Sequence, residues 1–308
     1  MISKLFVKDA RLRPIWRIVI YAFLVIFVAA ALAAIFEAIF GGRHEEQLSF
    51  GVIIESEVAA FVAVLVVSIV LRRYLDRRSV ASLGFAMRGP WVRLLCVGIL
   101  LGAGMQVVAN VLLWASGSAH VIGYAGLHSD LQIVVVAIAI LLPAAFVEEM
   151  SFRGYILQNV WEEWGLVPAI VVSSIGFAVL HMLNPHWREQ LLLTIAGLVM
   201  FALWACMSLL FTKSLWLALG AHMAWNLFEG PVFGLPLSGL DMPIPTVVRQ
   251  IVTGPQWLTG GSFGPEAGVS SLVALIVGFF VLWALYLRGA FADAADTRED
   301  YARAQTRL

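Results

Sequence analysis

Charged residues are scarce in this sequence: only 13% of its 308 residues are Asp, Glu, Lys or Arg, whereas 61% are hydrophobic. Soluble domains carry about 25% charged residues, so a soluble protein of this composition could not cover its surface with polar groups. The mean hydropathy of +0.90 indicates that lipid surrounds most of the chain. An excess of positive charge is also missing, because the formal net charge is zero, and this argues against a nucleic-acid partner.

Several familiar signatures are missing as well. The two cysteines, Cys96 and Cys206, both lie in apolar runs, so they say nothing about the redox compartment. No HExxH motif occurs, so the soluble zinc-protease interpretation lacks support. The GxSxG string at residues 260–264 lies in a Gly- and Pro-rich loop rather than in the elbow between a strand and a helix, so the serine-hydrolase interpretation lacks support as well. We find no internal repeat of the kind that builds inverted-repeat transporters.

Long apolar runs are what the sequence has in abundance. A helix needs about 20 apolar residues to cross about 30 Å of hydrocarbon. We therefore predict an all-α, polytopic membrane helix bundle of about eight transmembrane helices, of which the fifth and seventh are short and interrupted by polar residues. The runs are Pro14–Phe40, Val52–Leu71, Trp91–Ala115, Leu131–Ile156, Val167–Leu183, Leu191–Phe211, Leu215–Phe228 and Val269–Leu287.

The organisation that we expect is a single integral membrane domain over residues 1–308. Its parts are a motif-bearing core at about 82–230, an external loop at 230–268, a final span at 269–287 and a cytoplasmic tail at 288–308. Long loops are often functional, but an ordered cap over the bundle explains this Gly- and Pro-rich loop equally well. Gly98 and Gly102 form a GxxxG pattern, which we interpret as close helix packing.

The positions of the basic residues predict the orientation. With both termini in the cytoplasm, most of the twenty Lys and Arg residues lie on the cytoplasmic side, and only Arg43, Arg188 and Arg249 lie outside. We therefore expect a multi-pass protein of the plasma (inner) membrane with both termini cytoplasmic.

The fourth run holds three formally charged residues: Glu148, Glu149 and Arg153. Ionisable side chains inside a span cost about 2.5–3.5 kcal/mol each on insertion scales and are functional candidates. Glu149 and Arg153 are four residues apart with the acid first, which favours an ion pair on one helix face. Glu148 lies about 100° around the helix from Glu149 and has no local partner. An ion pair therefore does not explain Glu148.

Two histidines complete a candidate site: His181 in the fifth run and His222 in the seventh, with Asn226 one turn after His222. A lone intramembrane histidine is more often a hydrogen-bonding group between helices, but two of them beside an unpaired glutamate favour catalysis. Glu148 lies 17 residues before Gly165 and His181 lies 16 residues after it. In a hairpin that turns at Gly165, both lie about 24–26 Å from the turn.

Such a cluster suits hydrolysis of an amide bond. A carboxylate beside a histidine can deprotonate a water, and a second histidine with an amide donor can hold the oxyanion of a carbonyl under attack. Glu148, His181 and His222 could also form a zinc-like metal site with one open position. The residues alone do not decide whether the site holds a divalent metal such as zinc or has no cofactor.

The motifs Glu148-Glu149-x-x-x-Arg153, Phe177-x-x-x-His181 and His222-x-x-x-Asn226, in this order on separate spans, resemble the CPBP family. These are intramembrane proteases related to the type II CAAX prenyl endopeptidase and to bacteriocin-processing proteins, and the resemblance covers about residues 82–230. It implies that Glu148 and His181 activate water, that His222 and Asn226 hold the oxyanion, and that Glu149 and Arg153 give structural support. Both metal-dependent and metal-free mechanisms are proposed for the family.

The implied partners are the lipid bilayer and a protein or peptide substrate in or at the membrane; a CAAX-like substrate is an expectation from the family alone. Two other function classes remain open. Intramembrane Glu and His residues also mark the paths of proton- or ion-coupled transporters, and the same fold could serve as a catalytically silent scaffold or immunity protein. The remaining histidines, His44, His120, His128 and His186, are expected to be ordinary surface residues.

Overall fold

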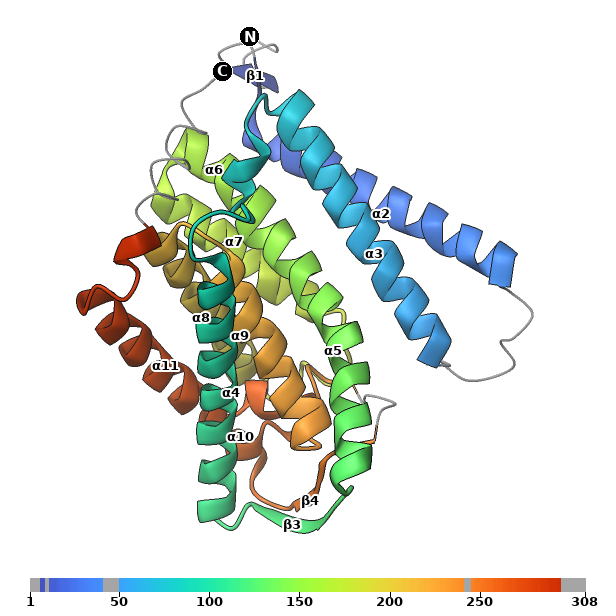
Figure 1. The fold of residues 1–308 in the computed structure, drawn as a ribbon, viewed down its shortest axis with the longest axis vertical. Coiled ribbons are helices and arrows are strands. Elements are labelled where there is room, and N and C mark those ends of the chain that lie inside the picture. The colour runs from blue at the N-terminus through green and yellow to red at the C-terminus, as the bar shows by residue number, and fades with distance from the viewer. Residues whose placement is uncertain (1–5, 9–10, 41–49, 241–244, 295–308) are drawn as a thin grey trace.

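The computed structural model describes residues 6–8, 11–40, 50–240 and 245–294 (Figure 1). Helices dominate this part of the chain, as expected from its apolar runs, and short strands join some of them. The longer helices are α2 (Pro14–Phe40), α3 (Phe50–Val70), α4 (Trp91–Ala115), α5 (Leu127–Glu149), α6 (Leu157–Trp164), α7 (Leu166–His181), α8 (Leu191–Thr212), α9 (Trp216–Leu227) and α11 (Val269–Leu287).

Each of the eight predicted runs coincides with a helix, so the predicted class of polytopic helical bundle is confirmed. Six of the helices in the described ranges are long and apolar enough to cross a membrane. The other two are α7, with 16 residues, and α9, with 12. Helix α7 ends at His181, whereas α9 continues directly into a π-helical segment, Phe228–Val232. The count of eight spans is therefore approximate.

Helix α9 occupies the centre of the bundle and packs most closely against α4. The backbones approach so tightly that a Cβ atom added at Gly98 would lie 2.1 Å from the carbonyl oxygen of Leu217. One added at Gly102 would lie 2.1 Å from the carbonyl oxygen of Ala221. The GxxxG pattern of α4 is thus a packing motif, as expected, and it fixes the position of the helix that carries His222.

Helices α5, α6 and α7 form the hairpin that was predicted from the sequence. A π-helical turn, Met150–Ile156, joins α5 directly to α6, so the continuous helical segment is longer than the predicted run. Gly165 ends α6 with a φ of 88°, a conformation that glycine adopts without strain. Helix α7 then runs back along α6 and the π-helical turn.

Helices α2 and α3 form a second hairpin that leans away from the other helices in Figure 1. Buried polar contacts attach it to α6. Arg17 donates to the side-chain oxygen of Asn159 at 3.0 Å, and Arg72 pairs with Glu162 at 2.7 Å. These contacts hold one end of the hairpin, while residues near the start of α3 reach the candidate site.

Two strands cap the opposite end of the bundle, which the sequence did not indicate. Strand β3 (Ala119–Tyr124) follows α4 and pairs antiparallel with β4 (Val248–Val252) from the long connection after α9. The short helix α10 (Gln256–Thr259) lies in the same connection, and Leu235, Leu237 and Phe263 are buried. The described part of this connection is therefore an ordered cap. A two-residue pair, β1 (Val7–Lys8) with β2 (Arg11–Leu12), precedes α2.

Candidate active site

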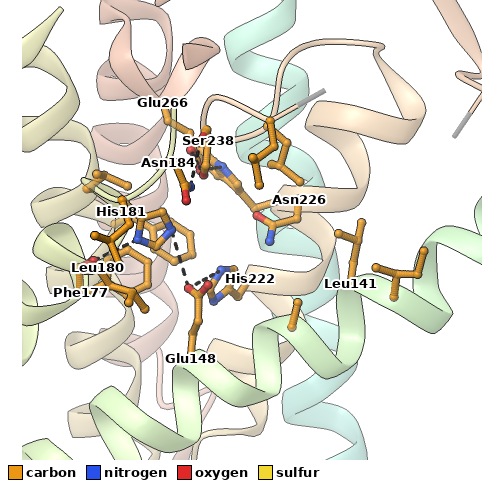
Figure 2. A pocket seen from close by; sticks show the side chains of 18 of the residues that line it. Leu141, Glu148, Phe177, Leu180, His181, Asn184, His222, Asn226, Ser238 and Glu266 are labelled. Carbon is orange, nitrogen blue, oxygen red and sulfur yellow. Dashed lines mark hydrogen bonds and ion pairs between the residues drawn. The ribbon is translucent and has the colours of Figure 1, made fainter. Parts of the chain in front are cut away.

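A cavity of about 540 Å³ lies between α3, α5, α7, α8, α9 and the cap. Glu148, His181, His222 and Asn226 all line it, so the fold brings together the four residues proposed as catalytic (Figure 2). They come from three helices that are separated along the chain. Apolar side chains form most of the remaining wall, which gives the polar groups a poorly solvated environment.

Glu148 faces both histidines through one carboxylate oxygen. Its Oε2 atom lies 3.9 Å from Nε2 of His181 and 3.6 Å from Nε2 of His222 (Figure 2). The common height of Glu148 and His181 that was calculated from the hairpin is therefore confirmed. Both distances exceed the range of a direct hydrogen bond, and they suit a small reactant held between the three groups.

The other ring nitrogen of each histidine is held by a neighbour. Nδ1 of His181 lies 3.0 Å from the backbone carbonyl oxygen of Phe177. A carbonyl oxygen only accepts, so Nδ1 carries the hydrogen and Nε2 is directed into the cavity. Nδ1 of His222 lies 2.9 Å from Oε1 of Glu149. In both histidines it is therefore Nε2 that is available for chemistry.

Glu149 and Arg153 form the ion pair that their spacing predicts. Arg153 Nη1 lies 3.0 Å from Glu149 Oε1, and both side chains are completely buried. The guanidinium of Arg153 also lies over the ring of Phe177, 4.5 Å from its centre. Because Glu149 also contacts His222, the pair connects α5 with α7 and α9. The sequence showed the pair but not its contact with His222, which depends on how α9 packs.

Asn226 lies one turn beyond His222 on α9 and is partly exposed to the cavity. Side chains from the cap approach the same region: Glu266 accepts hydrogen bonds from Nε1 of Trp225, at 3.2 Å, and from the hydroxyl of Ser238. Figure 2 shows Glu266 and Ser238 on the side of the cavity opposite Glu148. Sequence reasoning missed both, because no local pattern indicates where a loop folds back.

Glu57 of α3 is a further cavity residue that was missed. The sequence could have indicated Glu57 as a functional candidate, because it is an ionisable residue within the predicted run Val52–Leu71 and such residues are costly in a span. It lacks the neighbouring opposite charge that drew attention to Glu149 and Arg153.

The proposed metal ligands do not gain support from this arrangement. Zinc binds histidine nitrogens at about 2.0–2.1 Å and carboxylate oxygens at about 2.0–2.2 Å, so its ligands must converge on one point. Across the described ranges, no three His, Cys, Asp or Glu side chains are grouped so that they could hold a metal ion. The described residues therefore give no support for Glu148, His181 and His222 as metal ligands.

The remaining histidines either do not line the cavity or lie outside the residues that the structure describes. His186 is exposed, and its Nδ1 atom lies 2.7 Å from Glu189. This hydrogen bond lowers the pKa of the Glu189 carboxyl. His120 is exposed on β3. His44 and the side chain of His128 lie outside the described residues.

Comparison with known proteins gives one match. Residues 130–228 match the family model described as type II CAAX prenyl endopeptidase Rce1-like. This segment is about a third of the chain and contains most of α5 and all of α6, α7, α8 and α9, and thus all three motifs. No curated protein and no solved structure matches the chain.

Proposed function

This chain belongs, through its Rce1-like domain, to the CPBP family of intramembrane proteases, and we propose that it hydrolyses a peptide bond with water activated by Glu148 and His181. The family supports a multi-pass membrane protease that acts on a peptide or protein substrate at the membrane. The roles of the individual residues and the reaction mechanism are our proposal.

The observation that carries this proposal is the position of Glu148 Oε2, which faces Nε2 of both histidines at 3.6 and 3.9 Å in a largely apolar cavity. A water between Glu148 and His181 would have one group to take its proton and another to orient it. A structural interaction between helices would instead be expected to close these gaps to hydrogen-bond length.

In the proposed reaction, Glu148 removes a proton from water as the water oxygen attacks the carbonyl carbon of the substrate. His222, when it carries a proton on Nε2, and Asn226 donate hydrogen bonds to the oxyanion. The C–N bond then breaks, and the proton held by Glu148 passes to the leaving amine. The products are a new carboxyl group and a new amino group, and Glu148 is again a carboxylate.

Glu149 and Arg153 are assigned as positioning residues. Glu149 accepts from Nδ1 of His222, which aims Nε2 at the cavity, and Arg153 balances the charge of Glu149. The carbonyl of Phe177 has the equivalent role for His181. Such neighbours fix the orientation and tautomer of a catalytic histidine without touching the substrate.

The proposal is tested by product analysis. The purified protein in lipid nanodiscs is incubated with membrane-anchored reporter polypeptides, and the products are weighed by mass spectrometry. We expect two fragments whose masses sum to the substrate plus one water, and none from the His181→Ala variant. A transporter or a silent scaffold would leave the reporters intact, and fragments formed by His181→Ala at the parent rate would contradict the assignment.

A further inference from the structure

Glu57 lines the proposed catalytic cavity from α3, a helix outside the segment that matches the protease family. Its side chain is half-buried. No hydrogen bond or ion pair joins it to another residue in the described part of the chain, whereas Glu148 faces two histidines and Glu266 is held by Trp225 and Ser238. Glu57 is thus a carboxylate with no partner in a cavity where the other carboxylates have them.

The formally charged side chains that line the cavity are all negative. Glu57, Glu148 and Glu266 line it, and none of its described lining residues is a lysine or an arginine. Arg153, the cation nearest in sequence to Glu148, is fully buried and paired with Glu149. The histidines are the only lining groups that could become cationic, and Nδ1 of each is already held by another acceptor.

This distribution of charge selects among substrates. Electrostatic interactions strengthen as the effective dielectric constant falls, so like charges in a largely apolar cavity repel more than they would in water. A bound cation near Glu57 would relieve that repulsion and give this carboxylate a partner. A substrate carboxylate would add a further negative charge with no basic side chain to receive it.

We propose that Glu57 is a specificity-determining residue, which selects polypeptides with a lysine or arginine close to the bond that is cut. This inference rests on the proposed protease function.

The test compares peptides that differ only in charge. A neutral reference peptide is compared with matched peptides that carry one Lys or one Asp at successive positions beside the scissile bond, and with a peptide that ends there in a free carboxylate. The parent should cleave the best Lys peptide with a kcat/KM about ten-fold above that of the neutral peptide. The Asp and free-carboxylate peptides should be cleaved more slowly than the neutral peptide.

Variants at Glu57 then show whether this residue causes the preference. Glu57→Gln should reduce the ratio of kcat/KM between the Lys and neutral peptides to about one, and Glu57→Lys should make the Asp peptide the better substrate. Glu55→Gln is the matched control, because Glu55 lies on the same helix but does not line the cavity, and it should keep the parent ratio. If Glu57 had only a structural role, its variants would change kcat/KM by the same factor for all peptides, and the charge preference would not reverse.

Equal cleavage of the neutral, Lys and Asp peptides by the parent would overturn the inference while leaving the protease function standing. A Lys preference that persists in Glu57→Gln would likewise overturn the role of Glu57. If the parent cleaves none of these peptides, nor the membrane-anchored reporters, the proposed function itself fails and the inference fails with it.

Discussion

Glu148 and Glu149 are neighbours in the sequence, yet they have very different surroundings. Glu148 projects into the cavity, with about a fifth of its side chain (22%) exposed, whereas Glu149 is completely buried between Arg153 and His222. The difference arises because successive residues of a helix point about 100° apart. One carboxylate can therefore meet a reactant, while the other can act only through the side chains it holds.

Arg153 should be required for stability. Its removal leaves the Glu149 carboxylate buried without its cation, and breaking a buried pair costs about 3–5 kcal/mol. We expect Arg153→Ala to lower both the melting temperature and the folded yield in detergent. The double variant Glu149→Leu/Arg153→Met should recover most of the stability but no activity, because His222 loses its acceptor. An Arg153→Ala protein that melts like the parent would refute this role.

Asn226 should affect the reaction rather than the fold. It is partly exposed in the cavity and is proposed to donate to the oxyanion, and removal of one such donor typically costs about 10²–10³-fold in kcat. We expect Asn226→Ala to lose kcat to this extent with little change in KM and in melting temperature. A rise in KM with an unchanged kcat would show instead that Asn226 binds the substrate in its ground state.

At the scale of elements, the contact between α4 and α9 decides where His222 lies. An alanine at Gly102 would place its Cβ atom 2.1 Å from a backbone oxygen of α9, whereas at Gly104 it would meet nothing within 4 Å. Alanine otherwise favours a helix over glycine by about 1 kcal/mol. We therefore expect Gly102→Ala to lower melting temperature and activity together, and Gly104→Ala to leave activity unchanged and stability equal or higher. If both variants changed melting temperature and activity to the same extent, close packing of α4 against α9 at Gly102 could not be the cause.

The helices were predictable because span length and hydropathy reflect the thickness of the bilayer. The ion pair and the hairpin geometry were also predictable, because they depend only on spacing along a helix. The contact of Glu149 with His222, the pairing of β3 with β4 and the approach of Ser238 and Glu266 were not. Each joins segments that are distant in the chain, and neither periodicity nor composition specifies how such segments meet.

At the scale of the whole molecule, the basic residues predict which end of the bundle faces the cytoplasm. Met87, just before α4, and Ile122, in β3 just after it, are both well exposed. The 25 residues of α4 separate them by about 37 Å. In a Cys96→Ser background, an impermeant thiol reagent should label Ile122→Cys in intact cells and Met87→Cys only after permeabilisation. The reverse pattern would show that both termini lie outside.

The central claim is that Glu148 is the group that activates water. The measurement that tests it most directly is kcat of purified, folded Glu148→Gln on a reporter that the parent cleaves, with Glu55→Gln as the matched control. General-base catalysis contributes about 10²–10⁴-fold, so Glu148→Gln should lose at least about 10² in kcat while its melting temperature stays near that of the parent. Glu55→Gln should retain the parent rate. Cleavage by folded Glu148→Gln at a rate close to that of the control would contradict the account.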